Sequence, residues 1–101
     1  MIDKDLTQDA LRAIRDLCHR YQVRELSIFG SAIRDDFGTT SDIDLLVEFE
    51  PEAQTGFVTL SKMQRELSTI LQRPVDLVPK RGLKPRIREA VLSSARVLYA
   101  A

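Results

Sequence analysis

Residues 42–49 read DIDLLVEF, which is the pattern of a β-strand. Successive side chains of a strand point to opposite faces, so every second residue shares a face. The positions of one face are all apolar: Ile43, Leu45, Val47 and Phe49. The other face carries the carboxylates of Asp42 and Asp44, and Pro51 closes the strand. The stretch therefore predicts a strand with one face on a hydrophobic core and two aspartates on the other.

The segments on either side of this strand predict an α/β (α+β) fold, a small mixed sheet of about three strands flanked by helices. An apolar stripe at spacings of three and four predicts a helix over residues 7–21, and alternation predicts a strand over 24–29. A second helix is expected over 55–71, a third strand over 74–79 between two prolines, and a last helix from Pro85. We expect one domain over the whole chain.

Both later helices are expected to turn an apolar stripe toward the core. The stripe of the second helix is Phe57, Leu60, Met63, Leu67, Ile70 and Leu71. The stripe of the last helix is Ile87, Val91, Ala95 and Leu98. Because residues 42–79 form a strand–helix–strand unit, its two strands should be parallel with a right-handed crossover. The bend at Gly30 lets the first two strands run antiparallel.

The composition excludes several classes of protein. The 101 residues carry fifteen Lys and Arg and fifteen Asp and Glu, and a formal charge of zero argues against nucleic-acid binding by bulk electrostatics. The single cysteine, Cys18, excludes an intramolecular disulfide framework. No apolar run is long enough to cross a membrane, and the N-terminus does not resemble a signal peptide. We therefore expect a cytoplasmic protein that binds neither membrane nor nucleic acid directly.

The neutral total hides two blocks of opposite charge. Residues 35–52 hold seven acids and no base, whereas residues 80–101 hold six bases and one acid. Three of these seven acids, Glu48, Glu50 and Glu52, are expected to be solvated. The basic block is either a solvated surface or a contact for a triphosphate or an acidic partner.

Three aspartates have the pattern of a metal site. Asp42 and Asp44 lie on one strand face, and Asp76 alternates with Val75 and Leu77 in the same phase on the next strand. Carboxylates on one face repel one another unless a cation lies between them, and oxygen ligands suit Mg²⁺ or Mn²⁺. Two such ions can support an in-line phosphoryl displacement. The alternative is that Asp-x-Asp is only a solvated strand face, and the third aspartate favours the metal site.

A second candidate feature is the pair Gly30-Ser31, which follows the first expected strand. Glycine allows close approach of a ligand to the backbone, and the amides of the turn and of a short helix after Ser31 can hold phosphate oxygens. By itself a Gly-Ser pair after a strand is most often a plain turn.

The combined motif resembles the nucleotidyltransferase superfamily that includes DNA polymerase β. The resemblance lies in Gly30-Ser31, ten intervening residues and then Asp42-x-Asp44. The flanking residues are similar to the minimal nucleotidyltransferases, the smallest branch of the superfamily. These are Arg34, the run SDIDLLV over residues 41–47, PVDLV over 74–78, and the Leu83-Lys84-Pro85 segment.

The resemblance implies a chemistry for each matched residue. Asp42, Asp44 and Asp76 would be the catalytic residues and the ligands of two Mg²⁺ ions (or Mn²⁺), and Asp76 would also help to activate the attacking hydroxyl. Gly30 and Ser31 would hold the phosphates of a nucleoside triphosphate, with ATP the expected substrate. Arg34 would contact phosphate or form a loop ion pair, and the acids that follow it depart from the family pattern.

The resemblance also implies a partner. Polymerases of the superfamily use extra domains to grip an acceptor, so we expect the acceptor of this chain to arrive on another protein. In the minimal branch that protein is commonly a HEPN toxin, and the nucleotidyltransferase is its antitoxin, transferring AMP to the toxin in some members. Alternatives are a non-catalytic antitoxin that masks its partner and, less well supported, an antibiotic adenylyltransferase. Homo-oligomers and hetero-oligomers with the toxin both remain open.

Overall fold

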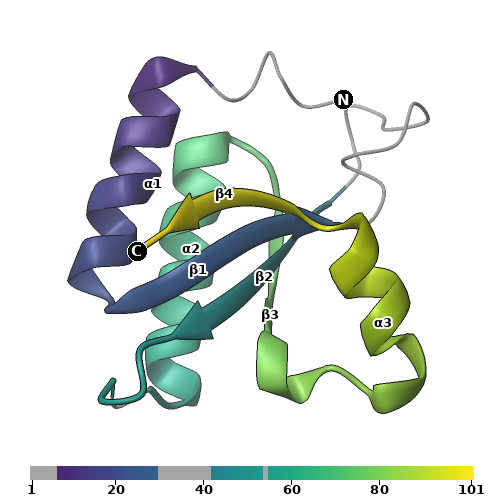
Figure 1. Cartoon of the computed structure of the whole chain (residues 1–101). Coiled ribbons are helices and arrows are strands. Elements are labelled where there is room, and N and C mark those ends of the chain that lie inside the picture. The colour runs from purple at the N-terminus through teal and green to yellow at the C-terminus, as the bar shows by residue number, and fades with distance from the viewer. Residues whose placement is uncertain (1–6, 30–41, 54) are drawn as a thin grey trace.

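The computed structural model describes residues 7–29, 42–53 and 55–101 and contains a sheet with helices packed on it (Figure 1). The bounds of its elements in chain order are α1 (Gln8–Arg20), β1 (Val23–Phe29), β2 (Ile43–Phe49), α2 (Phe57–Leu71), β3 (Val75–Pro79), the 3₁₀ helix η3 (Lys80–Gly82), α3 (Pro85–Ser94) and β4 (Arg96–Ala100). The α/β fold predicted from the sequence is confirmed. None of these helices is both long and apolar enough to cross a membrane.

The sheet is mixed, with the strand order β3-β2-β1-β4. β2 pairs with β3 in parallel and with β1 antiparallel, so both predicted strand directions are confirmed. The parallel pairing needs a crossover connection, which α2 provides. β3 lies at an edge of the sheet, where its terminal proline costs no ladder hydrogen bond.

The hydrophobic core lies between one face of the sheet and the two helices α1 and α2 (Figure 1). The apolar face of β2 supplies its centre, since Ile43 and Leu45 are fully buried and Val47 is 1% exposed. Because these residues face α1 and α2, the opposite face of β2, which carries Asp44, is turned away from both helices.

Thr7 caps the start of α1, since its hydroxyl accepts a hydrogen bond of 3.1 Å from the Ala10 amide.

A hydrogen-bonded cluster ties α1 to α2 at the edge of this core. The Tyr21 hydroxyl donates to the Glu66 carboxylate, and Arg20 donates to the same side chain at 3.0 Å. The Arg20 guanidinium also lies over the Tyr21 ring, 5.5 Å from its centroid. The hydrogen bond from Tyr21 lowers the pKa of Glu66, so the carboxylate stays ionised at neutral pH.

The C-terminal segment differs from the sequence prediction. The last helix ends at Ser94, and residues 96–100 form a fourth strand, β4, that pairs antiparallel with β1. None of the residues of α3 is buried, so the expected stripe through Ala95 and Leu98 is wrong. Val97, Leu98 and Tyr99 favour a strand, and β1 offers them an open edge whose backbone groups need partners.

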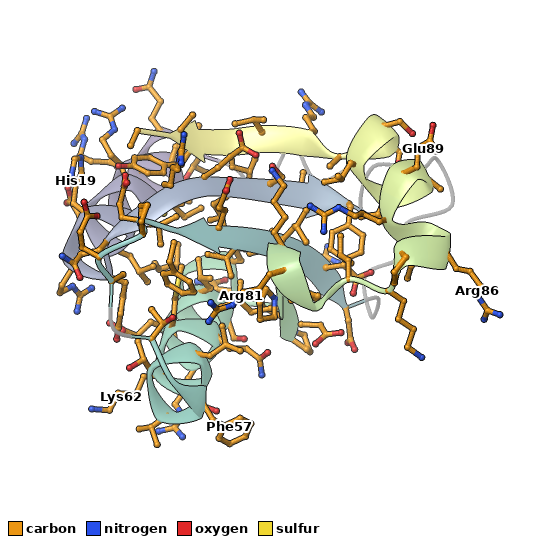
Figure 2. All side chains as sticks on the ribbon, turned by 60° about the horizontal axis from the view of Figure 1, so that its bottom comes forward. His19, Phe57, Lys62, Arg81, Arg86 and Glu89 are labelled. Atoms are coloured by element: carbon orange, nitrogen blue, oxygen red, sulfur yellow. The ribbon has the colours of Figure 1, made fainter. Side chains whose placement is uncertain are left out.

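The start of the second helix also differs from its prediction. α2 begins at Phe57, two residues later than expected, and this side chain is 82% exposed instead of joining the core. The first turn of α2 projects beyond the sheet, so its side chains have no facing layer there (Figure 2). The rest of the stripe is confirmed, with Met63, Leu67 and Leu71 buried.

Candidate active site

The structure brings two of the three predicted aspartates together. In the parallel pairing of β2 with β3, Asp44 lies directly beside Asp76, and neighbouring strands are about 4.8 Å apart. Their neighbours Ile43, Leu45 and Leu77 are buried in the core, so both aspartates lie on the face away from α1 and α2. A side-by-side pair of carboxylates on a sheet face is costly unless a cation or a proton is shared between them.

Asp42 lies just before β2 and is exposed. Its charge nevertheless reaches the pair. Burial and the negative charges of Asp76 and Asp42 raise the pKa of Asp44 above its ordinary value of 3.8. The charges of Asp42 and Asp76 therefore both act on Asp44, which lies between them in this cluster.

This cluster has the chemistry of a divalent-cation site, although its side chains are not in a chelating arrangement. In the described parts of the chain, no three His, Cys, Asp or Glu side chains lie close enough together to hold a metal ion. Repulsion between ionised carboxylates favours rotamers that keep them apart, and a cation reverses that preference. Asp44 and Asp76 on adjacent strands, with Asp42 two residues before Asp44, are the residues able to converge on one.

The predicted phosphate-binding residues Gly30, Ser31 and Arg34 lie outside the described residues. The residue that precedes them in the chain, Phe29, lies within the described part of the structure. β1 ends at Phe29, and Phe29 pairs with Asp44 across the antiparallel ladder. The described part of β1 therefore ends beside Asp44 of the aspartate pair.

Sequence reasoning missed an ion-pair cluster further along the same sheet face. Lys80 lies 3.4 Å from Glu48 on β2 and 4.0 Å from Glu25 on β1. The expectation that Glu48 is only solvated is therefore wrong, whereas Glu52 is exposed as expected. Three different segments supply these side chains, so only the strand order and register reveal the cluster. All three are partly exposed, and such pairs stabilise a fold by less than about 1 kcal/mol.

The two remaining side chains with catalytic potential play no part in the site. His19 is exposed on α1, and its ring lies 5.7 Å from that of Tyr99 in an edge-to-face contact. Cys18 is fully buried, and burial raises the pKa of its thiol to about 12. A thiol that stays protonated and buried is neither a nucleophile nor a metal ligand.

Comparison with known proteins gives the class to which this fold and its paired aspartates belong. Residues 11–98 match the sequence profile of the nucleotidyltransferase domain. The chain belongs to the nucleotidyltransferase family, and the resemblance seen in its motifs is confirmed.

Individual relatives show which members of the nucleotidyltransferase family the chain is similar to. The chain is 36% identical over 78 residues to the protein adenylyltransferase MntA of Thermococcus cleftensis, covering 77% of each protein. It is also 36% identical to a solved structure assigned as a minimal nucleotidyltransferase, with a TM-score of 0.68 over 89% of this chain and 94% of that one. The MNT antitoxin complex with a tri-AMPylated HEPN toxin of Shewanella oneidensis shares the fold, with a TM-score of 0.66, 19% identity and coverage of 95% and 74%.

The raised pKa of Asp44, caused by burial and by the charges of Asp76 and Asp42, predicts a pH-dependent gain of stability in Asp44→Asn. A carboxyl group with a raised folded-state pKa destabilises the fold while ionised, and this penalty fades as the pH falls toward 3.8 because the folded state takes up the proton first. With EDTA present, the variant should have the higher free energy of unfolding at pH 7, and its advantage should shrink by pH 4. Urea titrations at both values measure it, and an equal advantage at both would contradict the interpretation.

Proposed function

We propose that this chain transfers AMP from ATP to a hydroxyl group on a partner protein, and that the partner is a HEPN toxin for which this chain is the antitoxin. The observation that carries the proposal is the register pairing of Asp44 with Asp76 in a chain of the nucleotidyltransferase family. The names of its relatives support the acceptor class, since one is a protein adenylyltransferase and another is bound to an AMPylated HEPN toxin.

In this proposal the residues of the chain position the reactants. Asp42, Asp44 and Asp76 would hold two Mg²⁺ ions, or Mn²⁺, which when bound supply Lewis-acid stabilisation of the charge on the phosphates. Gly30 and Ser31 would hold the terminal phosphates, with Arg34 a further candidate contact. The partner hydroxyl attacks the α-phosphorus of ATP, the bond to the bridging oxygen breaks, and pyrophosphate leaves. Asp76 lies at the edge strand of the sheet, where it is accessible to the incoming hydroxyl and its proton.

A labelling experiment tests the reaction. The purified chain is incubated with Mg²⁺, ATP labelled at the α-phosphate and a HEPN protein encoded in the same genome. We expect label on the HEPN protein and one pyrophosphate released for each AMP transferred. Neutralisation of the toxin without any label would contradict AMP transfer and favour the masking antitoxin.

Cation binding is tested separately by thermal unfolding. A ligand that binds only the folded state at a hundredfold excess over its Kd adds about 2.7 kcal/mol of stability. We expect Mg²⁺ together with ATP to raise the Tm of the chain, and expect Asp44→Asn to abolish most of that rise. An equal rise in both proteins would show that the ligands bind elsewhere.

A further inference from the structure

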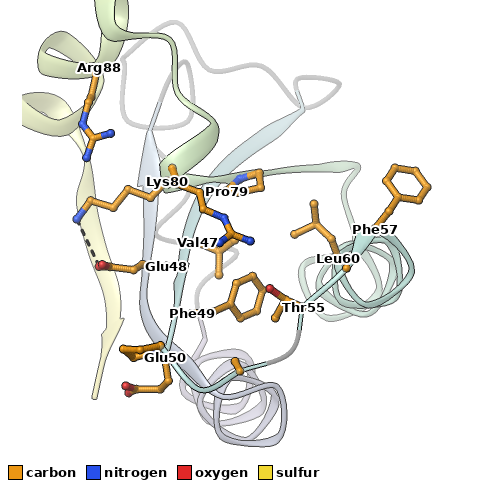
Figure 3. A pocket seen from close by; sticks show the side chains of 14 residues that line it. Val47, Glu48, Phe49, Glu50, Thr55, Phe57, Leu60, Pro79, Lys80 and Arg88 are labelled. Carbon is orange, nitrogen blue, oxygen red and sulfur yellow. Dashed lines mark hydrogen bonds and ion pairs between the residues drawn. The ribbon is translucent and has the colours of Figure 1, made fainter.

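A pocket of about 490 Å³ lies at the end of β2 opposite the aspartates (Figure 3). It is formed where β2 and β3 end, between the first turn of α2 and η3. Phe49 lies five positions after Asp44 in β2, which is roughly 16 Å in an extended strand. The pocket is therefore separate from the candidate active site and takes no part in the proposed reaction.

The floor of the pocket is apolar and continues onto an exposed shelf. Phe49 and Leu60 are only partly buried and line it together with Pro79. At its rim, Phe57 points away from the core (Figure 3). Its side chain is 82% exposed, and the adjacent Val58 is 68% exposed. Two adjacent exposed apolar side chains at the rim of a pocket suit contact with a polypeptide, which reaches beyond the pocket itself.

The residues that line the pocket carry three cations, Lys80, Arg81 and Arg88, and two carboxylates, Glu48 and Glu50. Lys80 pairs with Glu48 at 3.4 Å, and its second partner, Glu25 at 4.0 Å, lies outside the lining. Arg81 and Arg88 line the pocket and form no ion pair or hydrogen bond with residues 7–29, 42–53 or 55–101. Two free guanidinium groups thus face one remaining carboxylate, that of Glu50.

The two arginines approach the pocket from different elements. Arg81 extends from η3 toward α2 (Figure 2), and Arg88 extends from α3 toward Lys80 (Figure 3). Guanidinium groups bind carboxylates with two parallel hydrogen bonds. Arg86 has the same charge but points away into solvent on the far side of α3, so it provides a matched control (Figure 2).

We propose that this pocket docks an acidic segment of the acceptor protein, seating an apolar side chain on Phe49 and Leu60 and carboxylates on Arg81 and Arg88. Charge complementarity selects the acidic character, and the shelf formed by Phe57 and Val58 selects a polypeptide over a small anion. β3 ends beside Val47, so an extended segment could also lie along the remaining edge of β2. The inference rests on the proposed function, because it assigns the pocket to the protein that accepts AMP.

A peptide titration of the full chain tests the docking site without nucleotide or divalent cation. The probe is the acetylated, amidated peptide Asp-Glu-Leu-Phe, and the comparison peptide is Lys-Lys-Leu-Phe. We expect the acidic peptide to produce saturable shifts in the ¹H–¹⁵N NMR signals of pocket residues, and the basic peptide to produce none. Absence of saturable shifts, or equal binding of both peptides, would overturn the proposal.

Variants assign the binding to the two arginines. Arg81→Glu and Arg88→Glu, each made alone, should weaken binding of the acidic peptide by about tenfold or more, whereas Arg86→Glu should leave it within about twofold. Equal losses in all three proteins, whose net charges change equally, would overturn the proposal because they would reflect net charge alone. Because the titration contains no ATP, it does not depend on AMP transfer. A negative titration would contradict the docking site alone, and a failure of AMP transfer would contradict the proposed function alone.

Discussion

Asp44→Asn is expected to reduce AMP transfer by about 10³-fold or more while leaving the chain folded. The substitution keeps the shape of the side chain but removes the charge that lies beside Asp76 in the register of β2 and β3. Loss of a ligand that positions a Lewis acid costs several kcal/mol of transition-state stabilisation, and about 4 kcal/mol corresponds to that loss of rate. The rate of pyrophosphate release at saturating ATP and Mg²⁺ measures the effect.

The control for this variant is Asp16→Asn. Asp16 is exposed on α1, so its substitution changes the net charge equally without touching the cluster. It should retain the rate of the unmodified chain. Without cations, Asp44→Asn is expected to be more stable than the unmodified chain. A loss of its activity therefore cannot be attributed to unfolding. An active Asp44→Asn protein would remove the aspartate pair from the mechanism.

Much of the candidate site could be predicted because its signals are local. Alternation within DIDLLVEF places Asp44 opposite the core, and the strand–helix–strand order makes β2 and β3 parallel. The same phase in PVDLV then brings Asp76 to the same face. Prediction of this kind requires only the period of a strand and the handedness of a crossover.

The features that could not be predicted depend on contacts between segments that are distant in the sequence. β4 pairs with β1, its partner far away in the chain, and the helical spacing of Ile87, Val91 and Ala95 continues into Leu98, which hides the strand. Lys80 is a loop residue in the sequence, and only the strand order places it beside Glu25 and Glu48. The pocket forms because β3 ends beside Val47, before β2 ends at Phe49. This register between the two strands cannot be predicted from the composition of either one.

Leu17→Ala is expected to destabilise the fold by about 2–5 kcal/mol, a large part of the ~5–15 kcal/mol typical of a domain of this size. Leu17 is fully buried in the core between α1 and the sheet. Its truncation removes apolar contact area and leaves a cavity that the surrounding side chains fill only partly. A urea titration should show a lower midpoint with an unchanged slope.

Leu11→Ala is the matched control, because it is the same substitution on the same helix. Leu11 is 38% exposed, and alanine is the better helix former, so the cost should be below about 1 kcal/mol. Equal costs at both positions would mean that α1 does not pack on the sheet as described. Because α1 lies on the face opposite Asp44 and Asp76, Leu17→Ala should still bind Mg²⁺ and ATP at temperatures where it remains folded. The core thus sets the stability of the chain, and in the proposed function the aspartate face sets its chemistry.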